Sequence, residues 1–443
     1  MSDVATTLIW NAGVITHPFD SASRVGMALC EVPTAGGNTA RYAIPHELVE
    51  FAQGFDGRRT TADLARQHCA VYPTRTAAQL ESLVDSFLSP RGLLIAPGTA
   101  RAEAPAARKS TYLLARIPLL PPVLLNPLGR MLAPLFARPG IAALGALIVA
   151  SQWWFFTTVR PGASLTGVHL TGASAVQVAL LVSLGSVVHE IGHATAGIRF
   201  GCRNIKVGWG VYWYYSVFYT DLSEAWRLPR MQRAVVDLGG IYFQLLYLVA
   251  IAVWYLGTGW TPLLYVFLFS DLEIASYLSP FFRLDGYWLM SDLFGIANLR
   301  AQSLVMLRRG LASLPAGGPR RANTRDPWVL GRGASVALGV YAGASVVFFG
   351  GVWFAMLRGF GVGLFEHYHE TVVRSWAAML SPDRTVQSVA LAAIDVFWRT
   401  TAIVGLMMFV VRAIRACARH VLRAGRRVWP AAALRRQSLA NEA

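Results

Sequence analysis

The sequence predicts a mainly α-helical, polytopic membrane protein with six transmembrane helices and a small N-terminal α+β domain of winged-helix-like pattern in the cytoplasm. The first observation is composition: 54% of the 443 residues are hydrophobic and 14% are charged, whereas soluble domains carry about 25% charged residues. The second is that the apolar residues are concentrated in long runs. The four cysteines lie far apart without a CxxC pair. Together these features exclude a disulfide scaffold, collagen and intrinsic disorder.

Residues 1–96 are expected to form the soluble domain. The predicted elements are strands at 25–32, 41–44 and 92–95 and helices at 45–51, 61–69 and 76–88. Thr76 and Gln79 have the spacing of a capping box, which marks the beginning of the third helix. The pattern is similar to the small winged-helix domains that bind the leaders of ribosomally made peptides. That similarity implies a peptide-docking module, and a plain cytoplasmic cap is the alternative.

The rest of the chain is expected to be mostly helical. Residues 97–138 are predicted to be a linker and an apolar segment at the membrane interface, since its prolines remove helix donors. Six apolar runs follow, each near the ~20 residues that a bilayer core requires: 141–159, 173–198, 235–256, 262–282, 334–357 and 389–411. The first four runs belong to a core at 139–300. A basic loop at 301–333 separates it from 334–443, which holds two further helices and a basic tail.

The basic residues orient these spans. The chain carries 40 Lys and Arg against 24 Asp and Glu, a net charge of +16. Arginines cluster after the second, fourth and sixth spans, whereas loop 160–172 has only Arg160 and loop 257–261 has none. The positive-inside rule therefore predicts a multi-pass membrane protein with both termini in the cytoplasm. Acidic residues leave 45–95 without a basic face, which argues against nucleic acid as a partner.

The strongest chemical motif is the HExxH sequence at 189–193. On a helix, His189 and His193 are one turn apart and share a face, so both imidazoles can reach one metal ion. Zinc accepts two such nitrogens and a third protein ligand and leaves one position for water. Glu190 lies beside the ligands and is a candidate general base. The alternative is two packed helical histidines with Glu190 in an ion pair, but three ionisable groups within an apolar span are costly.

A third ligand is expected from the LDG sequence at 284–286, at the end of the fourth span. Under the predicted topology, Asp285 lies on the same side of the membrane as the histidines. Gly286 would allow the backbone to leave the helix and turn the carboxylate inward. The alternative is an ordinary helix-end carboxylate paired with Arg283. Beside the HExxH motif, the ligand interpretation is favoured.

This pairing of HExxH on one span with LDG on a later one resembles the site-2 protease family of intramembrane zinc metalloproteases. The resemblance covers about residues 173–300. It implies one Zn²⁺ per chain, held by His189, His193 and Asp285, with Glu190 as the catalytic base.

Two segments refine the resemblance. The sequences WRLPR at 226–230 and PFFRLDGYW at 280–288 look closest to a bacterial branch of peptide zinc metalloproteases. Members of that branch accompany ribosomal peptide biosynthesis, including daptide-type clusters. The chain departs from the family at two positions that are linked to holding substrate. Gln244 and Tyr277 stand where members of the family commonly have asparagine, and Ser279 lies near Tyr277 in the sequence. Gln244, Tyr277 and Ser279 are therefore the candidate substrate-binding residues.

Residues 207–219 are rich in Trp, Tyr and Val, which favours extended chain. Members of the family place a membrane-dipping β-hairpin after the HExxH helix. An exposed edge here would pair with an extended peptide by strand addition. An interfacial aromatic belt is the alternative.

Charged and histidine residues elsewhere in the apolar region are weaker candidates. Asp271 and Glu273 lie in the fourth span, where a polar path to the metal is one interpretation. Asp395 and Arg399 are spaced to pair with each other along the sixth span. The histidines at 367 and 369 are expected to be solvated in an outer loop.

These features predict a zinc metalloendopeptidase that cleaves a peptide bond in or next to the membrane and removes the leader of a ribosomally made precursor peptide. The expected partners are the lipid bilayer, a membrane-associated or precursor peptide, and peptide-modifying enzymes or an exporter. One alternative is regulated intramembrane proteolysis of a membrane signalling protein. Another is a non-catalytic metal- or peptide-binding subunit of a modification or export complex. A transporter is disfavoured because no inverted repeat is evident.

Overall fold

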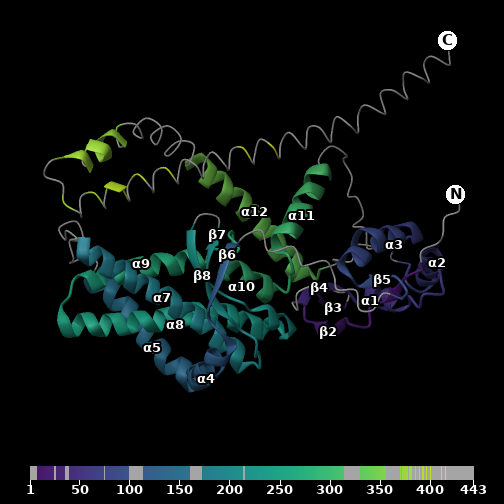
Figure 1. Cartoon of the computed structure of the whole chain (residues 1–443), viewed down its shortest axis with the longest axis horizontal. Helices are drawn as coiled ribbons and strands as arrows, with labels where there is room; N and C mark the ends of the chain where they lie inside the picture. Colours follow the sequence, from purple (N-terminus) through teal and green to yellow (C-terminus); the bar gives the residue numbers. More distant parts are fainter. Residues whose placement is uncertain are drawn as a thin grey trace, which may run out of the picture. The chain divides into compact units, whose positions relative to one another are not determined.

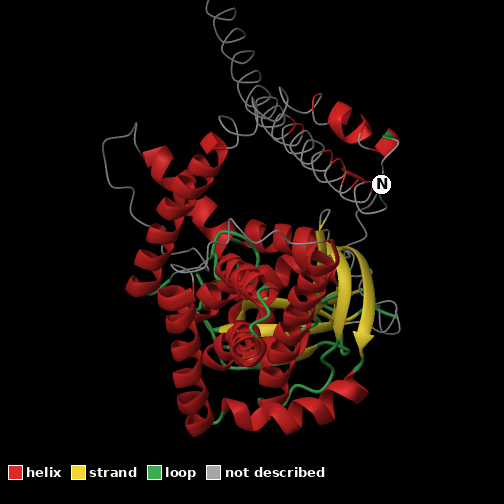
Figure 2. Ribbon diagram, turned by 90° about the vertical axis from the view of Figure 1, so that its left-hand side faces the viewer, coloured by secondary structure: helices red, strands yellow, loops and turns green. Residues whose placement is uncertain are grey.

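The structure is a computed structural model in which helices dominate the described chain (Figure 2). The chain divides into two units, Met1–Val346 and Val347–Ala443. The N-terminal domain and the candidate site both belong to the first unit. The described residues are 7–23, 26–34, 39–73, 75–98, 113–159, 172–212, 215–313 and 330–355, with scattered positions between 370 and 415.

The N-terminal domain combines two small sheets with three helices. Strands β2 (Ile15–Phe19), β3 (Met27–Pro33) and β4 (Thr39–Pro45) form an antiparallel sheet with β3 in the middle. Strand β1 (Ile9–Trp10) pairs with β5 (Leu94–Ile95). The helices are α1 (His46–Gln53), α2 (Thr61–Val71) and α3 (Ala77–Leu83), and α3 continues as a π-helical turn to Leu88. The predicted helices and strands of this domain are therefore confirmed, with shifted ends, and so is the Thr76–Gln79 capping box.

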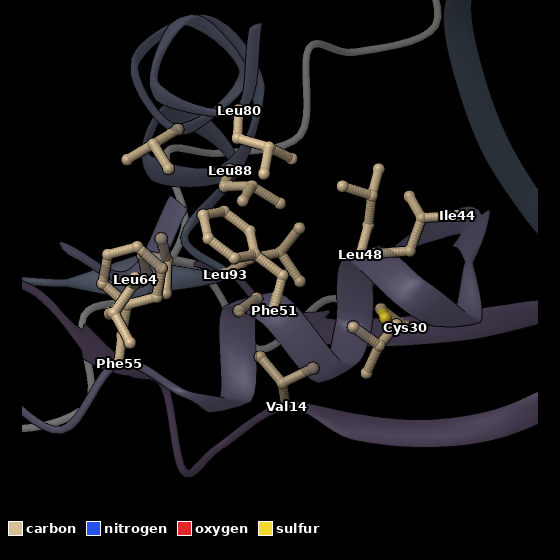
Figure 3. Close-up of a cluster of buried hydrophobic side chains, with 14 of the residues drawn as sticks. Val14, Cys30, Ile44, Leu48, Phe51, Phe55, Leu64, Leu80, Leu88 and Leu93 are labelled. Atoms are coloured by element: carbon tan, nitrogen blue, oxygen red, sulfur yellow. The ribbon is translucent and has the colours of Figure 1, made fainter. Parts of the chain in front are cut away.

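One core holds these elements together (Figure 3). Phe51 on α1 and Leu64 on α2 pack with Leu80 on α3 and with Leu93 before β5, and each is at most 5% exposed. Fully burying such a side chain stabilises the fold by about 1.5–3 kcal/mol. The sequence interpretation missed β1 and β2. Strand β2 contains Pro18, which is tolerated because β2 lies at the edge of its sheet.

Four helical segments among the described residues are long and apolar enough to cross a membrane: Arg138–Val159, Ala173–Arg199, Arg230–Thr258 and Arg332–Val352. They correspond to α5 (Arg138–Trp154) with the π-helical turn after it, α7 (Gly172–Arg199), α8 (Arg230–Thr258) and α12 (Arg332–Ala355). Helices α7 and α8 pack against each other and against α9 (Pro262–Tyr277) (Figure 1). The first, second, third and fifth predicted spans are thus supported.

The prediction of six spans is not confirmed. The fourth, predicted at 262–282, is helical only to Tyr277, so α9 has 16 residues and a length of about 24 Å. Helix α9 ends before the Ser279–Pro280 pair, because the residue that precedes a proline disfavours helical backbone. The sixth, predicted at 389–411, lies mostly outside the described residues.

A third antiparallel sheet packs beside α7. Strand β7 (Val207–Tyr212) lies between β6 (Leu113–Leu120) and β8 (Tyr215–Thr220). The expectation of extended chain in the aromatic segment is therefore confirmed as a hairpin. The apolar segment that was predicted to be interfacial begins with strand β6, which accommodates Pro118 at a sheet edge. It leads into α4 (Pro122–Leu132), which packs on α7.

Helices α7 and α8 approach each other through two glycines. A Cβ added to Gly192 would overlap the carbonyl oxygen of Gly239, and one added to Gly239 would lie 2.8 Å from the carbonyl oxygen of Gly192. Glycine at both positions lets the backbones come close, as small residues do in membrane helix pairs. This crossing lies one residue from His193 and therefore sets the position of the candidate site between the helices.

Gly192→Ala is expected to lower the melting temperature of the protein purified in detergent, because the added methyl group forces the helices apart. Overpacking of this kind costs about 1–3 kcal/mol. The matched control is Gly145→Ala on α5, where an added Cβ meets nothing within 4 Å. Thermal unfolding of both variants is the measurement, and equal melting temperatures would contradict the close crossing.

The N-terminal domain contacts the helical region through a buried carboxylate. Glu31 on β3 is 3% exposed and accepts hydrogen bonds from Arg227 Nε at 2.8 Å and from Arg41 Nε at 2.9 Å. Phe19 stacks on Trp226 with 6.0 Å between ring centroids. Arg227 and Trp226 belong to the 3₁₀-helical segment Ser223–Arg227 that precedes α8. The contact therefore links the small domain to the chain that enters α8.

This contact is expected to weaken at acidic pH. Burial favours a higher pKa for the Glu31 carboxyl, but the hydrogen bonds and charges of Arg227 and Arg41 outweigh it, and the pKa lies below its ordinary 4.5. A lowered folded-state pKa gives stability that is complete above the unfolded pKa and is lost as the pH falls through the folded one. Glu31→Gln should remove this pH dependence.

Hydrogen exchange over 27–33 and 223–227 measures the effect. Because a hydrogen bond to a charged group contributes about 1.5–3 kcal/mol, Glu31→Gln should speed exchange in both segments about tenfold or more at pH 7. Glu50→Gln, at a half-exposed carboxylate of the same domain, is the control. Unchanged exchange in Glu31→Gln would show that the ion pair does not hold the domain in place.

Candidate metal centre

Three side chains converge between α7 and α10 (Asp285–Phe294). His189 and His193 lie one turn apart on α7 and are 2% and 4% exposed. His189 Nε2 lies 3.0 Å from His193 Nε2 and 2.9 Å from Asp285 Oδ2, and His193 Nε2 lies 3.5 Å from Asp285 Oδ1. The prediction that HExxH and Asp285 meet in space is confirmed by these distances. The group could hold a metal ion.

Asp285 reaches the histidines in a different way from the one predicted. It does not end the fourth span but is the first residue of α10, where a carboxylate interacts favourably with the helix dipole. A Cβ added to Gly286 would overlap the carbonyl group of Leu278. The glycine therefore allows the start of α10 to lie close to the end of α9. Its role is this close approach and not the break in the helix that was predicted.

The polar atoms of this group suit a cation. His193 Nδ1 donates a hydrogen bond to the carbonyl oxygen of Val236 at 2.7 Å, which leaves a lone pair on Nε2. Asp285 Oδ2 is buried without a hydrogen-bond partner among the residues that the structure describes, although it lies 2.9 Å from His189 Nε2. Acceptor atoms packed this closely repel one another unless a positive charge lies among them. A metal ion bound by two imidazoles and a carboxylate satisfies all three side chains.

Gly240 makes room for the imidazoles. A Cβ at this position on α8 would overlap Nε2 of both His189 and His193. The close approach of α8 therefore covers the site on one side, and a larger residue would displace the two histidines. The sequence interpretation did not identify this glycine.

Glu190 lies next to the metal-binding group and is held by β8. Thr220 Oγ1 lies 2.6 Å from Glu190 Oε2 and 3.0 Å from the Glu190 carbonyl oxygen. Thr220 is the last residue of β8, so the hairpin directly orients the carboxylate. The sequence interpretation missed Thr220, because nothing in its local pattern shows which residue of the hairpin faces α7.

A cavity of about 810 Å³ contains these groups. It is lined by His189, Glu190, His193 and Asp285, by residues 217–221, and by further residues from α8, α9, α10 and the N-terminal domain. The end of β8 therefore forms part of the cavity wall.

The three candidate substrate-binding residues have different surroundings. Tyr277 lines the cavity, and its ring centroid is 4.6 Å from that of His189. Gln244 is fully buried and bonds to His189 and Glu273. Ser279 Oγ is buried without a hydrogen-bond partner among the described residues and is not among the residues that line the cavity. A role in substrate binding stays a prediction for all three.

The ionisable residues that were weaker candidates have different surroundings. Glu273 contacts Gln244 and lines the cavity. Asp271 accepts a hydrogen bond from Gln152 Nε2 at 3.0 Å. Asp395, Arg399 and the histidines at 367 and 369 lie outside the described residues.

No protein-family model, curated protein or solved structure matches this chain.

Proposed function

We propose that this protein is an intramembrane zinc metalloendopeptidase that hydrolyses a peptide bond in or next to the membrane. The observation that carries the proposal is the convergence of His189, His193 and Asp285 beside the carboxylate of Glu190 in one cavity. Two of the helices that form the site, α7 and α8, are long and apolar enough to cross a membrane. The combination of metal ligands, general base and apolar surroundings matches the needs of this reaction.

Zinc is the proposed metal, with one ion per chain. Two imidazole nitrogens and one carboxylate are a donor set that catalytic zinc sites use, and such sites keep a further position for water. Bound zinc would supply Lewis-acid chemistry, since it polarises a carbonyl group and lowers the pKa of water. The carboxylate of Asp285 also reduces the net charge of the centre.

Glu190 is the proposed general base. It accepts a proton from the water that attacks the peptide carbonyl carbon, and it then delivers this proton to the amine nitrogen as the C–N bond breaks. The contact with Thr220 Oγ1 at 2.6 Å holds one carboxylate oxygen. It leaves the other oxygen available for proton transfer.

The proposed substrate binds as an extended chain. A helical peptide hides its carbonyl groups in internal hydrogen bonds, so a membrane-spanning substrate must unwind before cleavage. Strand β8 is at the edge of its sheet, and residues 217–220 of this strand line the cavity. An extended peptide can add to such an edge through main-chain hydrogen bonds.

The proposed substrate class is a ribosomally made precursor peptide whose leader is removed, in a bacterial inner membrane. This part of the proposal comes from the resemblance of the motifs to peptide zinc metalloproteases. The N-terminal domain would dock the precursor, and peptide-modifying enzymes or an exporter would be partners. The contact of the N-terminal domain with the chain that enters α8 supports this docking role, because a peptide docked on that domain would begin near the cavity.

The experiment is a cleavage assay with purified protein in lipid nanodiscs. The substrates are membrane-anchored peptides with an extended segment next to the anchor, and product masses identify the bond that is cut. Wild-type protein should cleave, and removal of metal with a chelator should stop cleavage until zinc is restored. Metal binding without cleavage of any peptide, in wild type and Glu190→Gln alike, would instead favour a non-catalytic binding subunit.

A further inference from the structure

A carboxylate on an apolar helix has a specific polar partner in this structure. Glu273 lies on α9, and its Oε2 accepts a hydrogen bond from Gln244 Nε2 at 3.0 Å. Ser186 Oγ on α7 lies 3.4 Å from both carboxylate oxygens. Placing an ionisable residue in an apolar helix is costly, which makes a functional role the default hypothesis.

Gln244 connects Glu273 to His189, one of the proposed metal ligands. Its side chain is fully buried, with Oε1 lying 3.0 Å from His189 Nδ1. Because Gln244 Nε2 donates to Glu273 Oε2, the NH₂ group of Gln244 faces Glu273. The carbonyl oxygen of the amide must then face His189. Glu273 therefore determines which end of the Gln244 amide His189 meets.

The orientation of the amide selects one form of His189. Because Gln244 Oε1 can only accept, His189 Nδ1 must carry the proton. The lone pair of the neutral ring is then on Nε2, the atom that lies 2.9 Å from Asp285 Oδ2 and 3.0 Å from His193 Nε2. The backbone carbonyl of Val236 selects the same form of His193. The two histidines thus present matching nitrogen atoms to the centre.

We infer that Glu273 and Gln244 are positioning residues that hold His189 with its Nε2 lone pair directed at the metal-binding group. This inference rests on the proposed metal site and assigns Gln244 a role other than contact with substrate. Partners of this kind orient metal-ligating histidines, and their loss costs about 10–100-fold in metal affinity. The contacts from Glu273 through Gln244 to His189 join α9, α8 and α7, so the geometry of the site also depends on how these three helices pack.

The first measurement is zinc affinity of metal-stripped protein in detergent, by titration against a competing chelator. Gln244→Met keeps the size of the side chain and removes both hydrogen bonds, so it should weaken zinc binding about 10–100-fold. Glu273→Leu should weaken binding in the same direction, and Glu273→Gln, which retains an acceptor, should restore most of the affinity. Asp271→Leu is the matched control, since Asp271 lies on the same helix with Gln152 as its partner.

The second measurement is the ¹⁵N spectrum of the histidines in metal-free protein. The wild type should show His189 with the proton on Nδ1, and Gln244→Met should show a mixture of both neutral forms. A merely structural network would lower the melting temperature of the variants without changing either readout. Unchanged zinc affinity and an unchanged spectrum in Gln244→Met would overturn the inference.

The two proposals can fail separately. If wild-type protein binds no zinc but the spectrum shows the expected Nδ1 proton, which is lost in Gln244→Met, the proposed zinc protease fails and the positioning of His189 stands. If wild-type protein binds zinc and Gln244→Met binds it equally well, the metal site stands and the positioning role fails.

Discussion

Glu190→Gln is expected to reduce peptide cleavage by about 100- to 10,000-fold, the range that a general base contributes, while zinc binding is retained. The glutamine side chain keeps the length of glutamate and can still accept a hydrogen bond from Thr220. It cannot take a proton from the attacking water. Because Glu190 is not among the three metal-binding residues, its amide should leave the affinity for zinc close to that of the wild type.

Cleavage rate and zinc content are measured on the same nanodisc preparations, so that loss of fold is separated from loss of chemistry. The matched control is Glu81→Gln in the N-terminal domain, which is not among the residues that line the cavity. It should cleave at the wild-type rate. Equal rates in Glu190→Gln and wild type would refute the assignment of Glu190 and, with it, the proposed peptidase.

His193→Ala and Asp285→Asn are each expected to lower the affinity for zinc by more than about 100-fold. Loss of a residue that only supports a metal ligand lowers this affinity by about 10–100-fold. His193→Ala removes one of the three proposed protein ligands, and Asp285→Asn removes the single negative charge among them. Zinc stoichiometry and a competitive titration give the measurement.

Asp221→Asn is the control for the carboxylate, because Asp221 lines the same cavity and bonds to Ser223 instead of the histidines. Its zinc affinity should equal that of the wild type. Wild-type affinity in Asp285→Asn would remove Asp285 from the centre, and the search for a third ligand would move to other acids of the cavity. Loss of zinc in all three variants would point to the general charge of the cavity rather than to a defined ligand.

Local patterns in the sequence predicted much of the architecture. Four of the six predicted apolar spans correspond to helical segments that are long and apolar enough to cross a membrane, because length and hydropathy are properties of a single segment. The Thr76–Gln79 capping box marked the beginning of α3, because its two hydrogen bonds are made within one turn. The aromatic residues at 207–219 indicated extended chain, which the hairpin of β7 and β8 confirms. In contrast, a run of apolar residues could not show that α9 ends at Tyr277 or that β6 pairs with β7.

The sequence by itself determined that His189 and His193 share one face of a helix, because the helical period of 3.6 residues relates them within a single turn. It also identified Asp285 as the third member of the group. Only the tertiary structure decided how Asp285 reaches the histidines, that Thr220 holds Glu190, and that Gln244 joins Glu273 to His189. Each of these contacts joins different helices or strands. Which faces meet depends on packing, and here the small residues Gly192, Gly239, Gly240 and Gly286 permit the close approaches that bring those faces together.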